Sequence, residues 1–187
     1  MDKAPRKFAT QAKFVKKGLI IVHTGDGKGK STAAFGTALR SLGCGYKVAI
    51  VQFIKGNWKT GEEKAFKKFG SKCTMLSMGE GFTRDTKNFE RDCKVAAAAW
   101  AKCRQFLHDK KHHLVIFDEI NCVMNYNFLD KREVVKELRK KPPYKHIILT
   151  GRGAPLEVIA LADLVTEMKC IKHPFDAGIL AQPGIEY

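Results

Sequence analysis

The sequence predicts a doubly wound α/β domain, in which helices cover both faces of a mostly parallel sheet. Short apolar runs rich in β-branched residues alternate along the chain with helix-like stretches. A glycine-rich turn joins the first apolar run to the first helix-like stretch. With 187 residues, of which 44% are hydrophobic and 28% charged, the chain suits one domain with a substantial core.

Six apolar runs are expected to form the strands: Leu19–His23, Lys47–Phe53, Thr74–Met78, Leu114–Phe117, His146–Leu149 and Leu164–Met168. Several are almost continuously apolar, as in parallel strands that are covered on both faces. Helices are expected at Lys30–Leu42, Gly61–Phe69, Thr86–Asp109, Lys131–Lys140 and Pro155–Ala162. Ligands of such sheets bind beyond the carboxyl ends of the strands, so the residues that follow each strand are the candidates for function.

The turn after the first strand, Thr24–Thr32, carries a phosphate-binding motif. Its glycines let backbone N–H groups converge on an anion, and the N-terminus of the next helix adds positive potential. Lys30 is expected to reach the phosphates, and the Ser31 hydroxyl to ligate Mg²⁺. A regular Walker A loop, G-x-x-x-x-G-K-[ST], has its first glycine where this chain has Thr24, and Gly25 comes one residue late. We therefore expect a P-loop NTPase-like (RecA-like) fold whose loop holds polyphosphate in an unusual way.

A second motif, His113–Glu119, is an apolar strand that ends in two carboxylates. Such a pair can merely cap a turn, but with Lys30 and Ser31 upstream the Walker B function of metal ligation is favoured. Asp118 is expected to act on Mg²⁺ directly or through water, with Glu119 as the other candidate ligand. Activation of water by Glu119, as in many ATPases, stays open.

Lys55 and Arg152 also follow strands and could contact anionic groups. The six cysteines form no C-x-x-C pair, so the sequence favours reduced thiols in a cytoplasmic protein over a zinc site. No apolar run approaches the roughly 20 residues of a membrane span, and there is no signal-peptide core.

The chain is strongly basic, with 34 Lys and Arg against 19 Asp and Glu and a net charge of +15. Such an excess attracts polyanions, although lysines also simply coat protein surfaces. Three short basic clusters, Lys16-Lys17, Lys67-Lys68 and Lys140-Lys141, are scattered and lack interleaved aromatic residues. Nucleic-acid binding is therefore a minority hypothesis.

Together these motifs resemble the corrinoid adenosyltransferase family of the bacterial cobalamin pathway. The resemblance covers almost the whole chain after Lys17. It is carried by Gly18–Val22, Thr24–Gly36, Val51–Gly56, Gly61-Glu62, Gly81–Thr83, Phe117–Asn121, Thr150–Ala154, Ala162–Glu167, Lys172–Gly178 and Gly184–Glu186. The late first glycine of the phosphate loop is similar to this family's own pattern.

The resemblance implies transfer of the 5′-deoxyadenosyl group of ATP to Co(I) of a reduced corrinoid, with release of triphosphate. ATP and the corrinoid are then the substrates, and Mg²⁺ is the expected metal. Co(I) is already a powerful nucleophile, so no Ser/His or Cys/His machinery is needed, and the sequence shows none. A homodimer and a flavoprotein-type reductase that supplies Co(I) are further expectations, without a membrane or nucleic-acid partner.

Carried over by position, the resemblance also implies site residues. The triphosphate is expected on Gly25, Asp26, Gly27, Lys28, Gly29, Lys30, Ser31 and Thr32, with Ser31, Glu119 and Asp118 around the metal. Residues 1–17 are expected to form a basic lid, often across a dimer partner, and residues 18–187 the P-loop domain. Lys17 and Phe82 are expected at the corrinoid, where Phe82 helps to remove the lower axial ligand of cobalt.

One position departs from the family pattern. Two residues after Phe82 the family usually has tryptophan, and this chain has Arg84. Arg84 is still expected at the corrinoid, where it would pair with a phosphate or amide or point into solvent. His173 and Asp176 match the family pattern, with a structural role at least as favoured as ligand contact.

Two other functions stay open from the sequence. A phosphate-loop ATPase or kinase would cleave ATP at the γ-phosphate and release ADP. A nucleic-acid-binding module would bind DNA or RNA, and this binding would weaken with salt but would not be displaced by ATP or corrinoid.

Overall fold

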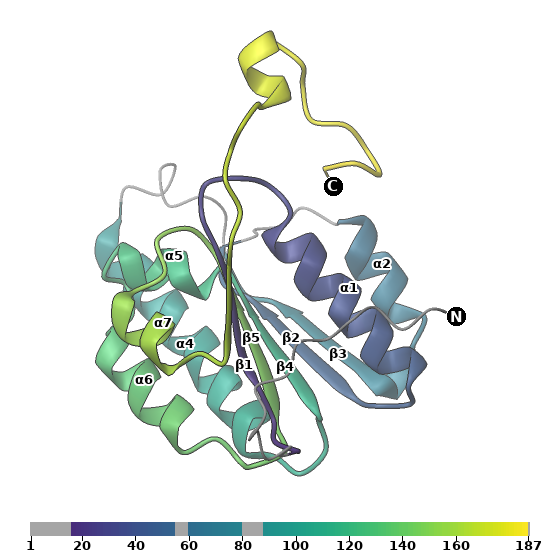
Figure 1. The fold of residues 1–187 in the computed structure, drawn as a ribbon, viewed down its shortest axis with the longest axis vertical. Coiled ribbons are helices and arrows are strands. Elements are labelled where there is room, and N and C mark those ends of the chain that lie inside the picture. The colour runs from purple at the N-terminus through teal and green to yellow at the C-terminus, as the bar shows by residue number, and fades with distance from the viewer. Residues whose placement is uncertain (1–15, 55–59, 80–87, 187) are drawn as a thin grey trace, which may run out of the picture.

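The computed structural model describes residues 16–54, 60–79 and 88–186. Its centre is a six-stranded sheet in the order β3-β2-β4-β5-β1-β6, and all neighbouring strands are parallel (Figure 1). The strands are β1 (Ile20–Thr24), β2 (Val48–Gln52), β3 (Cys73–Ser77), β4 (Leu114–Asp118), β5 (His146–Thr150) and β6 (Leu164–Glu167). The predicted parallel sheet is confirmed, and each strand begins and ends within one residue of its expected bounds.

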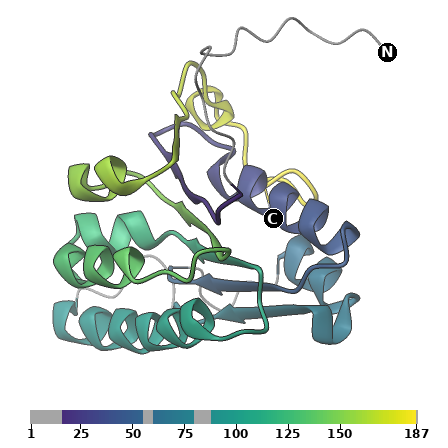
Figure 2. The ribbon, with the colours of Figure 1, turned by 60° about the horizontal axis from the view of Figure 1, so that its bottom comes forward.

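Helices cover both faces of the sheet, as predicted (Figures 1 and 2). On one face, Phe35 and Phe66 pack with Ile50 and Ile116. On the other face, Trp100 belongs to a larger core that also contains Ile120, Val134 and Val158 from later helices. The helices are α1 (Lys30–Gly43), α2 (Gly61–Lys67), α4 (Phe89–His108), α5 (Ile120–Asn125), α6 (Lys131–Arg139) and α7 (Leu156–Leu161), with 3-10 turns η1 (Gly70–Lys72) and η2 (Pro174–Ala177).

Helix α4 shows how side-chain spacing selects the buried face. Its buried residues recur at intervals of one, three and four, which is one stripe of an α-helix: Ala96, Ala99, Trp100, Cys103 and Leu107. The Trp100 ring meets Phe117 of β4 edge-to-face, with centroids 5.9 Å apart. The Asn88 side chain accepts the Arg91 N–H and so caps the start of the helix.

Helix α5 was not predicted from the sequence. It has six residues, too few for helical periodicity to show, and five of them are buried. It begins directly after Glu119, whose backbone has the left-handed φ of 66°. The chain therefore turns sharply from β4 into α5 at the predicted metal-binding pair.

Basic residues recur at the carboxyl ends of the helices. The last turns of α1, α2, α4 and α6 carry Arg40, Lys67, His108 and Arg139. Positive charge there interacts favourably with the negative end of the helix dipole. Part of the basic excess thus has a structural role. None of the described helices combines the length and the apolar character needed to cross a bilayer.

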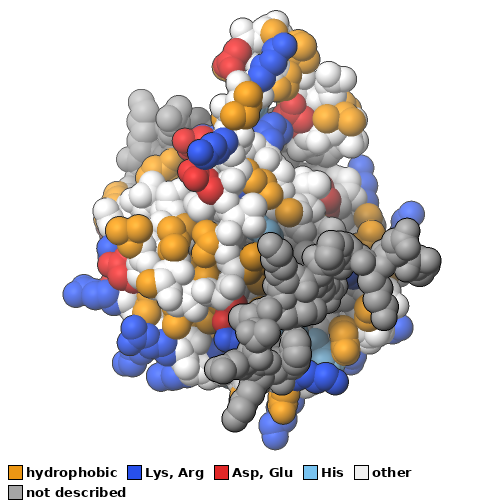
Figure 3. All heavy atoms as spheres, viewed as in Figure 1, with side chains coloured by type: hydrophobic (Ala, Val, Ile, Leu, Met, Phe, Trp, Pro, Cys, Tyr) orange, Lys and Arg blue, Asp and Glu red, His pale blue; other side chains and the backbone are white. Residues whose placement is uncertain are grey.

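The segment after β6 leaves the body of the domain and projects beyond the carboxyl edge of the sheet (Figure 1). Apolar side chains lie open on this segment (Figure 3), among them Ile171, Phe175, Leu180 and Ile185. Its end returns toward the phosphate loop, where Glu186 forms an ion pair with Lys28.

The environment of His146 predicts how stability depends on pH. Its Nδ1 accepts the Leu19 N–H at 3.2 Å. Burial lowers the pKa of His146 below 6.5, and Lys141 and His113 lower it further. The unfolded chain therefore binds this proton more tightly, so the free energy of unfolding should fall as pH drops from about 6.5 through the folded-state pKa.

The variant His146→Asn retains an acceptor but does not titrate. Urea denaturation between about pH 7 and pH 5 should show a flatter decline in stability for this variant than for the parent chain. Equal slopes for the two proteins would contradict the assignment.

Candidate functional site

The phosphate loop spans residues 25–29, between the end of β1 at Thr24 and the start of α1 at Lys30. Gly29 is the N-cap of α1 with a φ of 104°, so no side chain caps this helix, and its first turn carries no acidic residue. The first N–H groups of a helix have no partner within the helix. The start of α1 is therefore suited to bind an anion.

The chain just after β6 packs tightly against this loop. Met168 donates its N–H to the Thr24 carbonyl at 2.8 Å, and its own carbonyl accepts the Gly27 N–H at 2.7 Å. A Cβ on Gly25 would lie 2.4 Å from the Met168 oxygen, and one on Gly27 would lie 2.6 Å from the Lys169 oxygen. Both glycines are thus required by the close approach of two backbones.

The structure gives Thr24 a role that glycine could not fulfil. Thr24 is the last residue of β1, is 8% exposed, and its hydroxyl accepts the Ala154 N–H at 3.1 Å. This bond ties the start of the phosphate loop to the loop after β5. The departure from the regular Walker A pattern therefore exchanges one glycine for an anchoring hydroxyl.

Lys30 lies at the centre of the site. The residue is 7% exposed, and its ammonium donates to the Gly27 carbonyl at 2.5 Å. Burial lowers its pKa, the nearby Glu119 carboxylate opposes this shift, and Arg152 adds to it. The fold thus brings together Lys30, Glu119 and Arg152, which are widely separated in the sequence.

The two carboxylates at the end of β4 have different surroundings. Asp118 has no solvent exposure, and its two oxygens accept hydrogen bonds from Gln52 and Thr150, each at 2.8 Å. Glu119 is half-buried and close enough to Lys30 to affect its pKa. These surroundings favour Glu119 over Asp118 as a direct metal ligand.

Cys122 is a site neighbour that the sequence did not single out. Its thiol donates to Glu119 Oε2 at 2.9 Å, and its sulfur accepts the Arg152 N–H at 3.2 Å. Burial raises the pKa of this thiol to about 12, and the Glu119 charge adds to the shift. Cys122 is therefore a hydrogen-bond donor to Glu119. Only the turn into α5, which the sequence did not reveal, places it there.

The other expected site residues lie in three kinds of place. Ser31 and Thr32 are in the first turn of α1, and the side chains of Asp26 and Lys28 are exposed on the loop. Lys17 lies before β1, at the amino end of the strand, whereas the loop lies at its carboxyl end. Lys17 forms an ion pair with Asp163. Its expected contact with the corrinoid stays a prediction. Lys55, Phe82 and Arg84 lie outside the described residues.

The C-terminal pair has a local structural contact. His173 Nδ1 accepts the Phe175 N–H at 3.1 Å and so caps η2, which contains Asp176. This bond agrees with the structural role that the sequence left open for His173.

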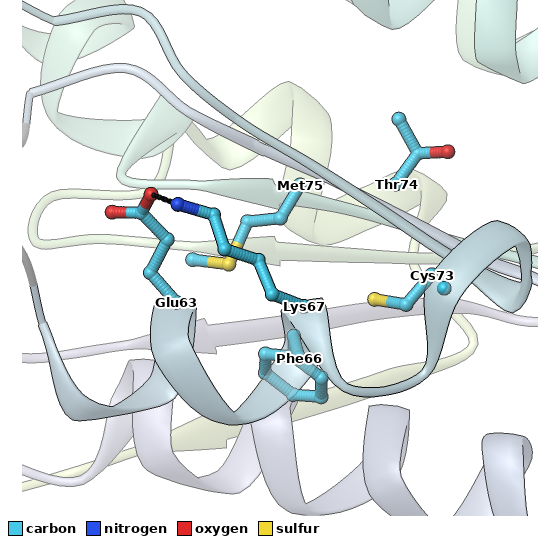
Figure 4. Close-up of a pocket in the computed structure, with 7 residues that line it drawn as sticks. Glu63, Phe66, Lys67, Cys73, Thr74 and Met75 are labelled. Carbon is cyan, nitrogen blue, oxygen red and sulfur yellow. Dashed lines mark hydrogen bonds and ion pairs between the residues drawn. The ribbon is translucent and has the colours of Figure 1, made fainter.

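A separate hollow of about 300 Å³ lies between α2 and β3 (Figure 4). Glu63 and Lys67 at its rim form an ion pair at 2.7 Å, and Phe66 and Met75 line its apolar part. Because β3 is at the far edge of the sheet from β1 and β6, this hollow does not belong to the phosphate site.

Comparison with known proteins decides which kind of phosphate-loop protein this is. Residues 16–187 match the model of the family described as ATP:corrinoid adenosyltransferase BtuR/CobO/CobP. The chain belongs to this corrinoid adenosyltransferase family. The prediction from the sequence motifs is thereby confirmed.

Similar adenosyltransferases match at nearly full length. A corrinoid adenosyltransferase from Sinorhizobium sp is 46% identical over 99% of this chain and 87% of its own length. Those of Pseudomonas aeruginosa and Escherichia coli K12 are 45% and 44% identical over 92% of this chain, covering 85% and 87% of their own lengths.

A more distant likeness concerns the fold alone. The crystal structure of the flagellar accessory protein FlaH from Methanocaldococcus jannaschii superimposes with a TM-score of 0.51. The two are 14% identical, and the match covers 80% of this adenosyltransferase and 70% of that chain. It supports the P-loop, RecA-like fold.

The packing of the phosphate loop generates a prediction for Gly27. In Gly27→Ala the added methyl group would collide with the backbone of Met168 and Lys169. We expect a loss of about 1–3 kcal/mol in the free energy of unfolding and roughly tenfold weaker ATP binding. Urea denaturation and isothermal titration calorimetry would measure the two effects.

Gly36→Ala is the matched control, because its added methyl group meets no atom within 4 Å on the exposed side of α1. This variant should gain about 0.5–1 kcal/mol, since alanine favours a helix over glycine. ATP binding by Gly27→Ala at the parent affinity would show that the contact with Met168 does not shape the loop.

Proposed function

We propose that the phosphate loop holds the triphosphate of ATP together with Mg²⁺, and so presents the nucleotide for adenosyl transfer. The activity itself follows from the family: the protein transfers the adenosyl group of ATP to a corrinoid. The observation that supports this site most directly is the buried Lys30 ammonium. It lies beside an uncapped helix N-terminus and interacts with both Glu119 and Arg152.

The chemistry requires charge stabilisation rather than a protein nucleophile. A Co–C bond forms as Co(I) donates its electron pair to the ribose C5′, and the C5′–O bond breaks. Triphosphate leaves with the electrons of that bond. We propose that Lys30, Arg152 and the first N–H groups of α1 stabilise the charge on the leaving group and hold it in line.

The residues present fit a magnesium ion. Mg²⁺ in phosphate sites takes oxygen ligands, usually one or two from the protein and the rest from phosphates and water. Glu119 supplies a carboxylate at the edge of the site, and we propose the Ser31 hydroxyl, in the first turn of α1, as the second protein ligand. When bound, the metal would add positive charge at the triphosphate.

The corrinoid side of the site is also a proposal. We infer that Phe82, Arg84 and Lys17 contact the corrinoid, and that residues 1–17 form a lid over it. Lys17 precedes β1 and the phosphate loop follows it, so the two lie at opposite ends of this strand. We therefore propose that the lid reaches the site of a second copy in a homodimer. A flavoprotein-type reductase is proposed as the source of Co(I), and the protein itself is proposed to be cytoplasmic.

Replacement of Lys30 tests the nucleotide side. Lys30→Met should reduce kcat/KM for ATP by roughly 100-fold or more, because one preorganised positive donor at the leaving group is lost. The exposed Lys94→Met, which removes an ion pair on α4, is the matched control and should stay near the parent value. Anaerobic assays with Mg²⁺, ATP and Co(I) corrinoid would report the rate.

The product of the same assay tests the reaction. Triphosphate and a light-sensitive alkylcorrinoid are expected in equal amounts. Release of ADP and phosphate without an alkylcorrinoid would instead indicate cleavage at the γ-phosphate and overturn the proposal.

Replacement of Glu119 tests the metal. Glu119→Gln should raise the Mg²⁺ concentration needed for half-maximal activity by roughly tenfold or more, since a neutral amide is a weaker ligand than a carboxylate. Glu90→Gln, at an exposed position on α4, is the control. An unchanged Mg²⁺ requirement in Glu119→Gln would exclude direct ligation by this residue.

A further inference from the structure

A row of polar side chains crosses the whole sheet at its carboxyl edge. In register, each strand contributes one residue, from β3 to β6: Ser77, Gln52, Asp118, Thr150, His23 and Thr166. The preceding row, two residues earlier, is apolar and packs against α1 and α2; it includes Met75, Ile50, Ile116, Ile148 and Ile21. Side chains two apart share a face, so the polar row lies on the face that α1 covers.

Hydrogen bonds connect the first four members of the row into one chain. Ser77 Oγ donates to Gln52 Oε1 at 2.9 Å, and Gln52 Nε2 donates to Asp118 Oδ2 at 2.8 Å. From the other side, Thr150 Oγ1 donates to Asp118 Oδ1 at 2.8 Å. Within the described residues the chain ends there, because the buried Nδ1 of the next member, His23, has no partner.

The Asp118 carboxylate determines the direction of these bonds. As an acceptor it requires a donor from each neighbour, so the Gln52 amide and the Thr150 hydroxyl must both direct a hydrogen toward it. Gln52, Asp118 and Thr150 are each at most 1% exposed, so water does not compete for these positions. The hydroxyl oxygen of Thr150 is thereby left to accept a hydrogen bond.

Thr150 uses that capacity on the backbone of Glu119. The Glu119 N–H donates to Thr150 Oγ1 at 2.9 Å. Glu119 has a φ of 66°, in the left-handed region that a residue with a side chain adopts only at an energetic cost. The hydrogen bond from this N–H to Thr150 favours the turn and so helps to determine where the Glu119 side chain lies. Cys122 then holds the carboxylate itself, through its bond to Oε2.

We propose that Gln52, Asp118 and Thr150 form a positioning chain for Glu119, with Cys122 as a second support, and that Asp118 anchors this chain instead of ligating the metal. The inference rests on the proposed ligation of Mg²⁺ by Glu119. Thr150 and Gln52 are positioning residues, since they act on the metal through Glu119 and touch neither substrate.

Thr150→Val tests the chain, because valine has nearly the shape of threonine but neither donates nor accepts. The measurement is the ratio of the ATP dissociation constants in EDTA and in Mg²⁺, by calorimetry on the full chain without corrinoid. This ratio should fall about tenfold in Thr150→Val, while the constant in EDTA stays within about twofold. A structural defect alone would weaken both.

Two variants serve as controls. Thr150→Ser keeps the hydroxyl and should restore the ratio of the parent protein. Thr166→Val makes the same substitution in the same row on the exposed edge strand β6, outside the chain, and should leave the ratio unchanged.

A ratio in Thr150→Val equal to that of the parent would overturn the positioning chain. If that variant lacks a cooperative thermal transition, Gln52→Met replaces it, because it removes the donor to Asp118 at similar volume. It should show the same fall, and a parent-like ratio would overturn the chain equally.

Glu119→Gln separates this inference from the proposal beneath it. If Glu119→Gln removes the Mg²⁺ effect and Thr150→Val does not, the metal site stands and the positioning chain falls. If Glu119→Gln leaves the Mg²⁺ effect intact, ligation by Glu119 falls, and the positioning chain falls with it.

Discussion

The buried carboxylate of Asp118 is the constraint on which the carboxyl edge of the sheet depends. Burial of such a group costs several kcal/mol unless hydrogen-bond donors replace the lost water. The neighbouring strands β2 and β5 supply those donors from Gln52 and Thr150. This requirement explains why β2 and β5, which are otherwise mostly apolar, end in polar residues. It also leaves the Thr150 hydroxyl directed so that it can accept the Glu119 N–H, where β4 turns into α5.

The phosphate loop is held by contacts on two sides. Thr24 binds the loop after β5 through its hydroxyl, and Gly27 binds the chain after β6 through its backbone. A loop tied in this way is preorganised, which suits a reaction whose catalysis depends on holding a triphosphate leaving group in line. The first glycine of the loop is Gly25 because the preceding position, Thr24, is the last residue of β1 and makes the contact with Ala154.

The fold could be predicted closely from the sequence because parallel buried strands are continuous apolar runs whose ends are marked by glycine and charge. The phosphate loop and the Asp118-Glu119 pair were recognisable because each follows such a run. Helix α5 was missed because a helix of six residues, five of them buried, is too short to show helical periodicity. Gln52 and Thr150 were predicted at strand ends. Their partner Asp118 is on another strand, and the local sequence does not show which strands are neighbours in the sheet. Cys122 could not be recognised as a site residue from the sequence, because only the turn at Glu119 places its thiol within hydrogen-bond distance of the Glu119 carboxylate.

The sequence by itself determined the class of fold, the phosphate loop and the family, because these depend on residue types at fixed spacing along one chain. Only the tertiary structure decided the surroundings of the two carboxylates at the end of β4. Asp118 and Glu119 are adjacent and chemically alike, yet strand pairing surrounds one with donors, and a left-handed turn places the other beside Lys30. That difference arises from neighbours that are distant in sequence, since burial and hydrogen bonding are set by the packing of strands and not by their order.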